Sequence, residues 1–360
     1  IMGLAAAALL CAAVPAHAAL LYEPGEVLPD GHERPMVHDA DLLAPQAHND
    51  LLEADLMIDA SDDSRVDFYE YRWNGGAVIE TSVEEPLVSY ESLRPNSVAE
   101  LEVRAVDDVG FRSDWNSAWR GVTPAAPNVI VAGDSVASGY SRAWFTGDST
   151  CVDEDYSYGA AVVDGVAASL PDAWAPRYVN VAFPGAGVGN VLQGGYDSCS
   201  DGYPSQVDSI VELADGETWN IVVVTAGINS TNWVDVITGL TRDTAFSLFD
   251  SGDKKACRAA VDEKWDLPDN AAHIAGTTGS IVRELSEHTN ASIYWTSYYQ
   301  LAGTKLVGAW SPIGPECEDE MNDALGQLHT AIRAGLTDEV TWVDLGSEPV
   351  PLQRWAGWPH

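Results

Sequence analysis

The chain has little positive charge and, beyond its first residues, no long apolar segment. Of 360 residues, 55 are acidic and 18 are basic, which gives a formal net charge of −37, and only four residues are lysine. A surface this negative repels phosphate backbones and anionic lipids, which argues against nucleic acid as a partner. No later stretch approaches the roughly 20 apolar residues that span a bilayer, so no membrane insertion is predicted. Because salt screens self-repulsion, we hypothesise a saline habitat.

The first residues, IMGLAAAALLCAAVPAHA, are the one strongly apolar stretch. They end in Ala16-His17-Ala18, the small-x-small pattern of a signal-peptidase site. Residues 1–18 are therefore predicted to be a signal peptide cleaved before Ala19, and the protein is predicted to be secreted, to the extracellular space or the periplasm. A genuine N-terminal helix is the alternative.

Cysteine is scarce as well. Once Cys11 leaves with the leader, Cys151, Cys199, Cys257 and Cys317 remain, enough for two disulfides in three possible connectivities. We expect Cys151–Cys199 and Cys257–Cys317, since each pair would join loops that flank one region. No Cys-x-x-Cys occurs, and no histidine lies at ligand spacing from a cysteine, so no zinc site is predicted.

Residues 48–122 are typical of an all-β module. In FYEYRW and AELEVRAV apolar side chains alternate with others, and turn signals separate the runs. The stretch YESLRPNSVAELEVRAVDDVGFRSDW resembles a fibronectin type III module, which implies a small sandwich that acts as a spacer or binding platform. TPAAP, residues 123–127, is predicted to be a stiff linker.

The pattern changes in residues 128–360. Five short apolar runs without alternation are NVIVAG, YVNVAF, NIVVVTAG, SIYWTSYY and VTWVDL, and helical periodicity lies between them. Strands buried on both faces that alternate with helices indicate an α/β domain, a parallel sheet with helices on each side. In such sheets the chemistry lies at the carboxyl ends of the strands.

Four of these strand ends carry residues suited to acyl chemistry. The first run ends in Gly133-Asp134-Ser135, where a serine hydroxyl on a sharp turn would be exposed. Gly185 follows the second run and could bring a backbone N–H close to a substrate oxygen, and Asn229 follows the third and could add an amide donor. His360 follows the last run and could serve as a base. Each block alone is also ordinary turn chemistry.

Together these blocks resemble the SGNH (GDSL-type) hydrolase family over residues 128–360. GDSVASG matches its serine block, and Gly185, Asn229 and WPH match the glycine, asparagine and histidine blocks. The resemblance implies a three-layer α/β/α, flavodoxin-like fold and an esterase or lipase without a metal or organic cofactor, which the leader predicts to be secreted. It also implies an acyl-enzyme on Ser135, with His360 as general base and the Ser135 N–H, the Gly185 N–H and the Asn229 amide as oxyanion hole. The substrate would be a small-molecule or polymer-borne ester.

Two positions depart from the family pattern. The family usually has an aspartate three residues before the histidine, where this chain has Gly357. Either the Gly357 carbonyl orients His360, which leaves a Ser–His dyad, or an acid such as Asp344 does. Ser230 stands where the family often has aspartate.

Several questions stay open on the sequence alone. They are whether the sequence is truncated after His360, which ester is the substrate, and which oligomeric state the protein adopts. The alternative function is a secreted binding or adhesion protein with an inactive α/β domain.

Overall fold

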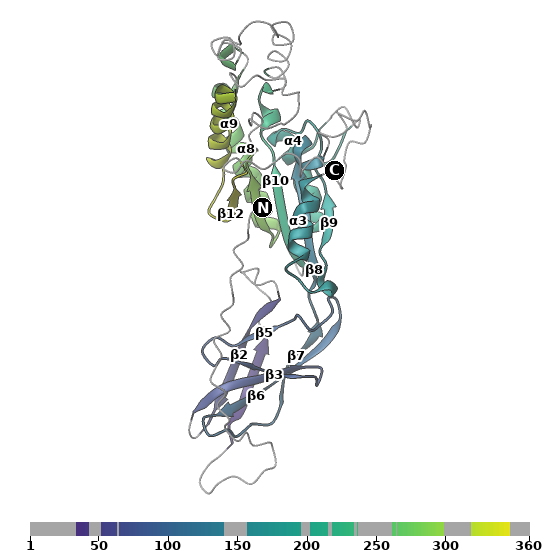
Figure 1. Ribbon diagram of the computed structural model, residues 1–360, viewed down its shortest axis with the longest axis vertical. Helices are drawn as coiled ribbons and strands as arrows, with labels where there is room; N and C mark the ends of the chain where they lie inside the picture. Colours follow the sequence, from purple (N-terminus) through teal and green to yellow (C-terminus); the bar gives the residue numbers. More distant parts are fainter. Residues whose placement is uncertain are drawn as a thin grey trace. The chain divides into compact units, whose positions relative to one another are not determined.

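The computed structural model of the chain divides into two compact units, Ile1–Thr123 and Pro124–His360, which are described one at a time (Figure 1). The predicted signal peptide, the cysteines, Gly357 and His360 lie outside the described residues. The structure describes residues 34–42, 52–62, 65–139, 157–195, 202–214, 218–233, 236, 261–263, 265–298 and 318–345.

The N-terminal unit consists of antiparallel strands in two sheets. One sheet has the order β1-β2-β5 and the other β4-β3-β6-β7. The strands are β1 (Met36–Leu42), β2 (Glu53–Ser61), β3 (Val66–Trp73), β4 (Val78–Thr81), β5 (Leu87–Ser89), β6 (Val98–Asp107) and β7 (Asn116–Val122). The predicted all-β class is confirmed, although β1 lies upstream of residue 48, the predicted start of the module. The likeness to fibronectin type III stays a prediction.

Alternating side chains explain this unit. In β3 the side chains of Tyr69, Tyr71 and Trp73 are buried. Tyr71 pairs with Val103 and Trp73 with Leu101 across the β3–β6 ladder, and both partners are fully buried. The Trp73 indole N–H also donates to the backbone oxygen of Ser89, at 2.8 Å, in β5 of the other sheet. Apolar burial and this bond therefore hold the two sheets together.

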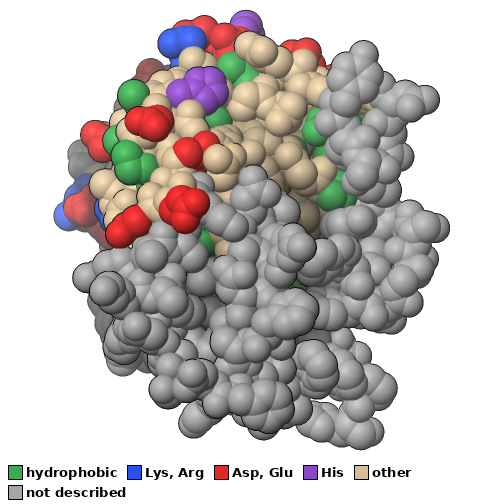
Figure 2. All heavy atoms as spheres, turned by 90° about the horizontal axis from the view of Figure 1, so that it is seen from above, with side chains coloured by type: hydrophobic (Ala, Val, Ile, Leu, Met, Phe, Trp, Pro, Cys, Tyr) green, Lys and Arg blue, Asp and Glu red, His purple; other side chains and the backbone are tan. Residues whose placement is uncertain are grey.

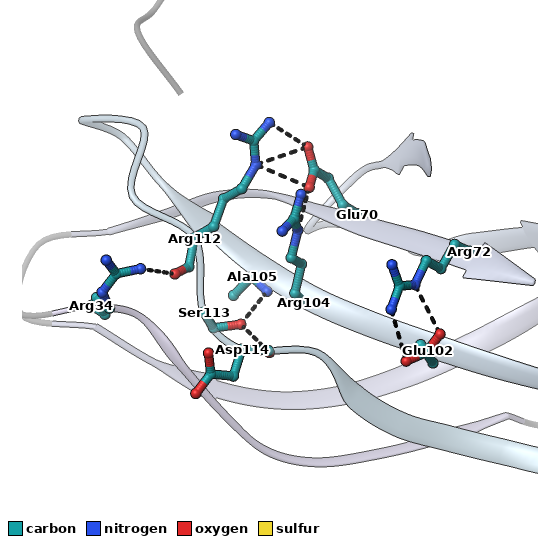
Figure 3. Close-up of polar contacts among 9 residues, drawn as sticks. All are labelled: Arg34, Glu70, Arg72, Glu102, Arg104, Ala105, Arg112, Ser113 and Asp114. Carbon is teal, nitrogen blue, oxygen red and sulfur yellow. Dashed lines mark hydrogen bonds and ion pairs between the residues drawn. The ribbon is translucent and has the colours of Figure 1, made fainter. Parts of the chain in front are cut away.

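A buried ion cluster adds to the same unit (Figure 3). Glu70 is only 2% exposed, and its carboxylate contacts Arg104 at 2.6 Å and Arg112 at 2.9 Å. The neighbouring pair Arg72–Glu102, at 2.8 Å, is about a quarter exposed. The buried carboxylate thus meets two guanidinium groups, as a charge removed from water requires.

The C-terminal unit contains one five-stranded sheet with the order β12-β11-β10-β8-β9. Every neighbouring pair is parallel. The strands are β8 (Ala125–Gly133), β9 (Arg177–Asn180), β10 (Thr218–Thr225), β11 (Ser292–Thr296) and β12 (Val340–Val343). They coincide with the five predicted apolar runs. β8 begins inside the segment predicted as a linker, because Ala125 already pairs with Thr218 of β10.

Helices cover both faces of this sheet. Ile130 and Ala132 of β8 belong to one core, whereas Val129 and Val131 point to another. The first core includes residues of α4 (Val188–Gln193), α5 (Gln206–Leu213), α8 (Leu267–His288) and α9 (Glu318–Arg333). The second packs against α3 (Tyr158–Ala167), drawn beside β8 and β9 in Figure 1. The predicted three-layer α/β/α fold is confirmed. Within the part of the chain that the structure describes, no helix is both long and apolar enough to cross a membrane.

Candidate active site

The strand order brings three of the predicted site residues to neighbouring strand ends. β8 lies between β9 and β10, and all three strands run parallel. Ser135, Gly185 and Asn229 follow these strands in the loops at their carboxyl ends. They therefore share one edge of the sheet, where open α/β sheets bind their ligands.

Ser135 lies on a sharp turn between β8 and the short helix α1 (Ser135–Ser138). The turn depends on Gly133, whose φ is +130°, and a Cβ there would lie 1.9 Å from the Thr225 oxygen. The buried side chain of Gln206 bonds to both backbone groups of Gly133, accepting from its N–H at 2.7 Å and donating to its oxygen at 2.9 Å. The turn is thus held in one conformation, with the Ser135 side chain partly exposed.

Asp134, just before Ser135, is fully buried and caps α1. Its Oδ1 accepts a hydrogen bond from the Val136 N–H at 2.9 Å, and its Oδ2 accepts one from the Tyr298 hydroxyl. Burial raises the pKa of Asp134 to about 7, although the bonds from Tyr298 and Val136 favour the charged form. An ionisable group therefore lies beside the predicted nucleophile and titrates near neutral pH.

The loop after β9 carries Gly185. This glycine is exposed, its φ is +80°, and a Cβ would meet open space. The Phe183 N–H donates to the Gly133 oxygen at 3.1 Å, which joins the loop to the Ser135 turn. The positive φ favours glycine here, and the open side leaves room for a ligand atom near the backbone.

Asn229 lies on the one-turn 3₁₀ helix η2 (Ile228–Ser230) after β10. Its Nδ2 approaches the Ala186 oxygen at 3.4 Å, directly after Gly185. Next to it, the Ser230 hydroxyl accepts a hydrogen bond from the Val188 N–H at 2.9 Å. The loop of Asn229 is therefore bonded to the loop of Gly185, and a side-chain amide has a second N–H to offer.

The predicted base, His360, and the Gly357 carbonyl lie outside the described residues, so their placement stays a prediction. Asp344, the competing acid, follows β12 at the same edge of the sheet, where it is exposed and its Oδ1 accepts from the Ser297 hydroxyl at 3.2 Å. His329 on α9 uses its Nε2 to accept the Tyr298 backbone N–H at 3.0 Å. Burial lowers the pKa of His329, and nearby Asp344 acts in the opposite direction. His329 is thus engaged in packing against Tyr298 at the end of β11.

Sequence reasoning missed Tyr298 and Gln206, which bond to the backbone or side chain of the residues just before Ser135. Their identity as a strand-end tyrosine and a helix-start glutamine gives no local sign of this role.

Among the described residues, no group of three histidine, cysteine or acidic side chains could hold a metal ion. On the face drawn in Figure 2, red acidic side chains lie on several sides of the described surface and blue basic ones are few, as the net charge leads one to expect.

The comparisons with known proteins give matches among solved structures. No protein-family model and no curated protein matches the chain. A phospholipase A1 from Streptomyces albidoflavus NA297 is 18% identical with a TM-score of 0.41, and the match covers 61% of this chain and 79% of the other. An extracellular lipase from Streptomyces rimosus is 17% identical, also with a TM-score of 0.41, over 62% and 81%.

A member of the lipolytic protein G-D-S-L family from Veillonella parvula DSM 2008 is 13% identical with a TM-score of 0.28, over 62% of this chain and 79% of the other. Because these identities and TM-scores are low, the function proposed below rests on the strand ends of this chain.

Proposed function

We propose that the chain is a secreted serine esterase of the SGNH type that hydrolyses carboxylic esters through an acyl-enzyme on Ser135. The observation that carries the proposal is the order of β9, β8 and β10. A serine on a sharp turn follows the middle strand, and an exposed glycine and an asparagine follow its two neighbours. A nucleophile flanked by donors on both sides is what attack on a carbonyl requires.

In the proposed reaction, Ser135 Oγ attacks the ester carbonyl carbon while His360 takes the hydroxyl proton. Negative charge develops on the carbonyl oxygen, where the N–H groups of Ser135 and Gly185 and the Asn229 amide would stabilise it. The tetrahedral intermediate collapses, and the alcohol leaves with the proton from His360. Water, activated by the same histidine, then attacks the acyl-enzyme and releases the carboxylic acid.

The held turn at Ser135 supports this chemistry. Gly133 and Asp134 are fixed by bonds to Gln206, Thr225 and Val136, so the backbone N–H of Ser135 is set before a substrate arrives. Donors fixed in advance need no reorganisation when charge develops, which makes them effective in catalysis. In the proposed reaction the Ser135 hydroxyl attacks the carbonyl carbon, and the Ser135 N–H binds the oxygen of the same carbonyl group.

Two further parts of the proposal concern the base and the export of the protein. His360 would be oriented by the Gly357 carbonyl, in a dyad, and Asp344 is the competing partner. A folded Asp344→Asn variant that loses its turnover would favour the triad instead. Export rests on residues 1–18, and N-terminal sequencing of the secreted product should begin at Ala19. A product that keeps the leader would contradict export by this route.

The test is hydrolysis of p-nitrophenyl acetate and longer-chain p-nitrophenyl esters by wild type and Ser135→Ala, in low and molar salt. Turnover should fall at least about 10³-fold in the variant because the nucleophile is lost. Ser169→Ala, an exposed serine after α3, is the matched control and should keep full turnover. Wild-type hydrolysis that Ser135→Ala retains would refute the assignment of the nucleophile. An inactive wild type that does not label with a fluorophosphonate would favour a binding protein.

A further inference from the structure

The hydroxyl of Tyr298 joins the two turns that carry the predicted nucleophile and the predicted oxyanion amide. Tyr298 follows β11 and is only 2% exposed. Its O–H donates to Asp134 Oδ2, and its oxygen accepts the Ile228 N–H at 3.0 Å. Asp134 directly precedes Ser135, and Ile228 directly precedes Asn229. One buried oxygen atom thus contacts the residue before each of them.

The bond to Asp134 acts on Ser135 through the carboxyl group. Asp134 uses Oδ1 to accept the Val136 N–H at 2.9 Å, and its own N–H donates to the Thr225 oxygen at 3.0 Å. Because Oδ2 is bound separately by Tyr298, both ends of the carboxyl group are held, and it cannot rotate without breaking a bond. The position of the carboxyl group therefore fixes the first turn of α1, which includes the Ser135 N–H.

Tyr298 is itself held in place by contacts with α9 and, through the preceding residue, with β12. Its backbone N–H donates to His329 Nε2 at 3.0 Å, and its ring lies parallel to the His329 ring, with centroids 6.3 Å apart. The preceding residue, Ser297, is buried and is bonded to Val343 of β12 through its N–H at 2.8 Å. A hydroxyl on such a support is a fixed reference point for the loops that it contacts.

We propose that Tyr298 is a positioning residue that sets the Ser135 turn and the Asn229 turn relative to each other. The inference rests on the proposed function, in which both turns must reach the same ester carbonyl. Oxyanion donors act only within a narrow range of positions, so a small shift of one turn weakens transition-state binding more than substrate binding. The tyrosine hydroxyl would keep the spacing between the Ser135 turn and the Asn229 turn constant through catalysis.

The first test is Tyr298→Phe, which removes one oxygen atom and keeps the ring. The change leaves the buried Ile228 N–H without this acceptor and Asp134 Oδ2 without this donor. With p-nitrophenyl acetate, kcat should fall about 10- to 100-fold, as for a misplaced catalytic group, with KM changed less than about threefold. Tyr158→Phe is the matched control, since it also removes one buried tyrosine hydroxyl, which bonds to the Thr225 side chain at 2.7 Å. It should keep kcat within about twofold.

A double-mutant cycle separates positioning from a structural role. If Tyr298 acts by placing Asn229, Tyr298→Phe should lower kcat little further once Asn229→Ala is present. A merely structural effect would instead lower kcat by the same factor in both backgrounds. That result, or a folded Tyr298→Phe enzyme within twofold of wild-type kcat, would overturn the inference. If Tyr298→Phe does not fold, Asp134→Asn replaces it in the same cycle, because it alters the other end of the bond and keeps an oxygen for the Val136 N–H.

Failure of the proposed function has a different signature. Hydrolysis by wild type that does not depend on Ser135 would remove the basis of both proposals. Hydrolysis that is lost in Ser135→Ala but unaffected by Tyr298→Phe would leave the esterase proposal intact and reject only the role of Tyr298. The two results are therefore distinguishable within one set of variants.

Discussion

Replacing Asp134 by asparagine should change how the stability of the α/β unit depends on pH. The carboxyl group is fully buried, accepts bonds from Val136 and Tyr298, and has its pKa raised to about 7 by burial. Asparagine has the same shape, keeps an oxygen for the Val136 N–H and is also a good N-cap. The substitution therefore removes the titration and keeps the N-cap bond to Val136, while it alters the bond to Tyr298.

The sign follows from linkage. Because the folded-state pKa of Asp134 lies above the ordinary value of 3.8, folding favours its protonated form. Its contribution to stability is complete below about pH 3.8 and is lost as the pH rises towards 7, after which the loss is constant. Between pH 5 and pH 8 the stability falls only up to about pH 7, which is about two pH units. Each unit lowers the free energy of unfolding by about 1.4 kcal/mol, so this contribution should fall by about 3 kcal/mol over the interval.

Asparagine does not titrate, so the variant lacks this loss. The free energy of unfolding of Asp134→Asn, relative to wild type, should therefore rise by about 3 kcal/mol from pH 5 to pH 8. Any constant effect of the amide, such as a weaker bond to Tyr298, cancels between the two pH values. Groups that titrate in both proteins, His329 among them, cancel as well.

The measurement is hydrogen exchange by mass spectrometry on peptides that cover β8 and β10, corrected for the intrinsic rate at each pH. Exchange of these buried strands reports the opening of the unit that contains Asp134. Asp164→Asn, at an exposed position of α3, controls for the loss of one negative charge from the same unit. A relative stability of Asp134→Asn that is the same at pH 5 and pH 8 would refute the reasoning, because burial would then not raise the pKa of this group.

In each unit a pair of substitutions, one at a buried and one at a more exposed position, tests the packing, again by hydrogen exchange. Gly133→Ala should destabilise the α/β unit by at least about 3 kcal/mol, because its φ of +130° and the Thr225 oxygen leave no place for a methyl group, whereas Gly165→Ala on open helix surface should stabilise it by about 0.5–1 kcal/mol. A Gly133→Ala protein as stable as wild type would contradict the tight turn before Ser135. In the N-terminal unit, Glu70→Gln should cost about 3–5 kcal/mol because it leaves two buried arginines without their carboxylate. Glu102→Gln, at a partly exposed ion pair, should cost less than about 1 kcal/mol, and equal losses for the two glutamates would show that burial does not decide the effect.

The fold of the α/β unit could be predicted because its signal is local. A strand covered by helices on both faces needs apolar side chains at successive positions, and the central residues of NVIVAG and NIVVVTAG are apolar without alternation. Their parallel pairing as β8 and β10, with Val131 opposite Val223, follows from helices that alternate with strands. The positions of Ser135 and Asn229 at one edge of the sheet then follow from topology alone.

The supports of the site could not be predicted in the same way. Tyr298 lies 164 residues from Asp134, and Gln206 lies 73 residues from Gly133. A tyrosine after a strand and a glutamine at the start of a helix satisfy local patterns with many possible partners. Which polar group they meet depends on how loops from separate strands are packed, and no periodicity in the sequence encodes that. His360 and the cysteine pairs remain predictions, since they lie outside the described residues.

Ser230 shows how a departure from a family pattern can keep the physical requirement. The family that the sequence resembles often has aspartate after the asparagine, and in this chain Ser230 uses the position to accept one hydrogen bond, from the Val188 N–H at 2.9 Å. A hydroxyl oxygen accepts that bond as a carboxylate does. Space is also limited, because a Cβ on Gly187 would lie 2.7 Å from the Ser230 Oγ. A small acceptor therefore joins the Asn229 loop to the Gly185 loop, and it does so without adding a negative charge where the proposed oxyanion would form.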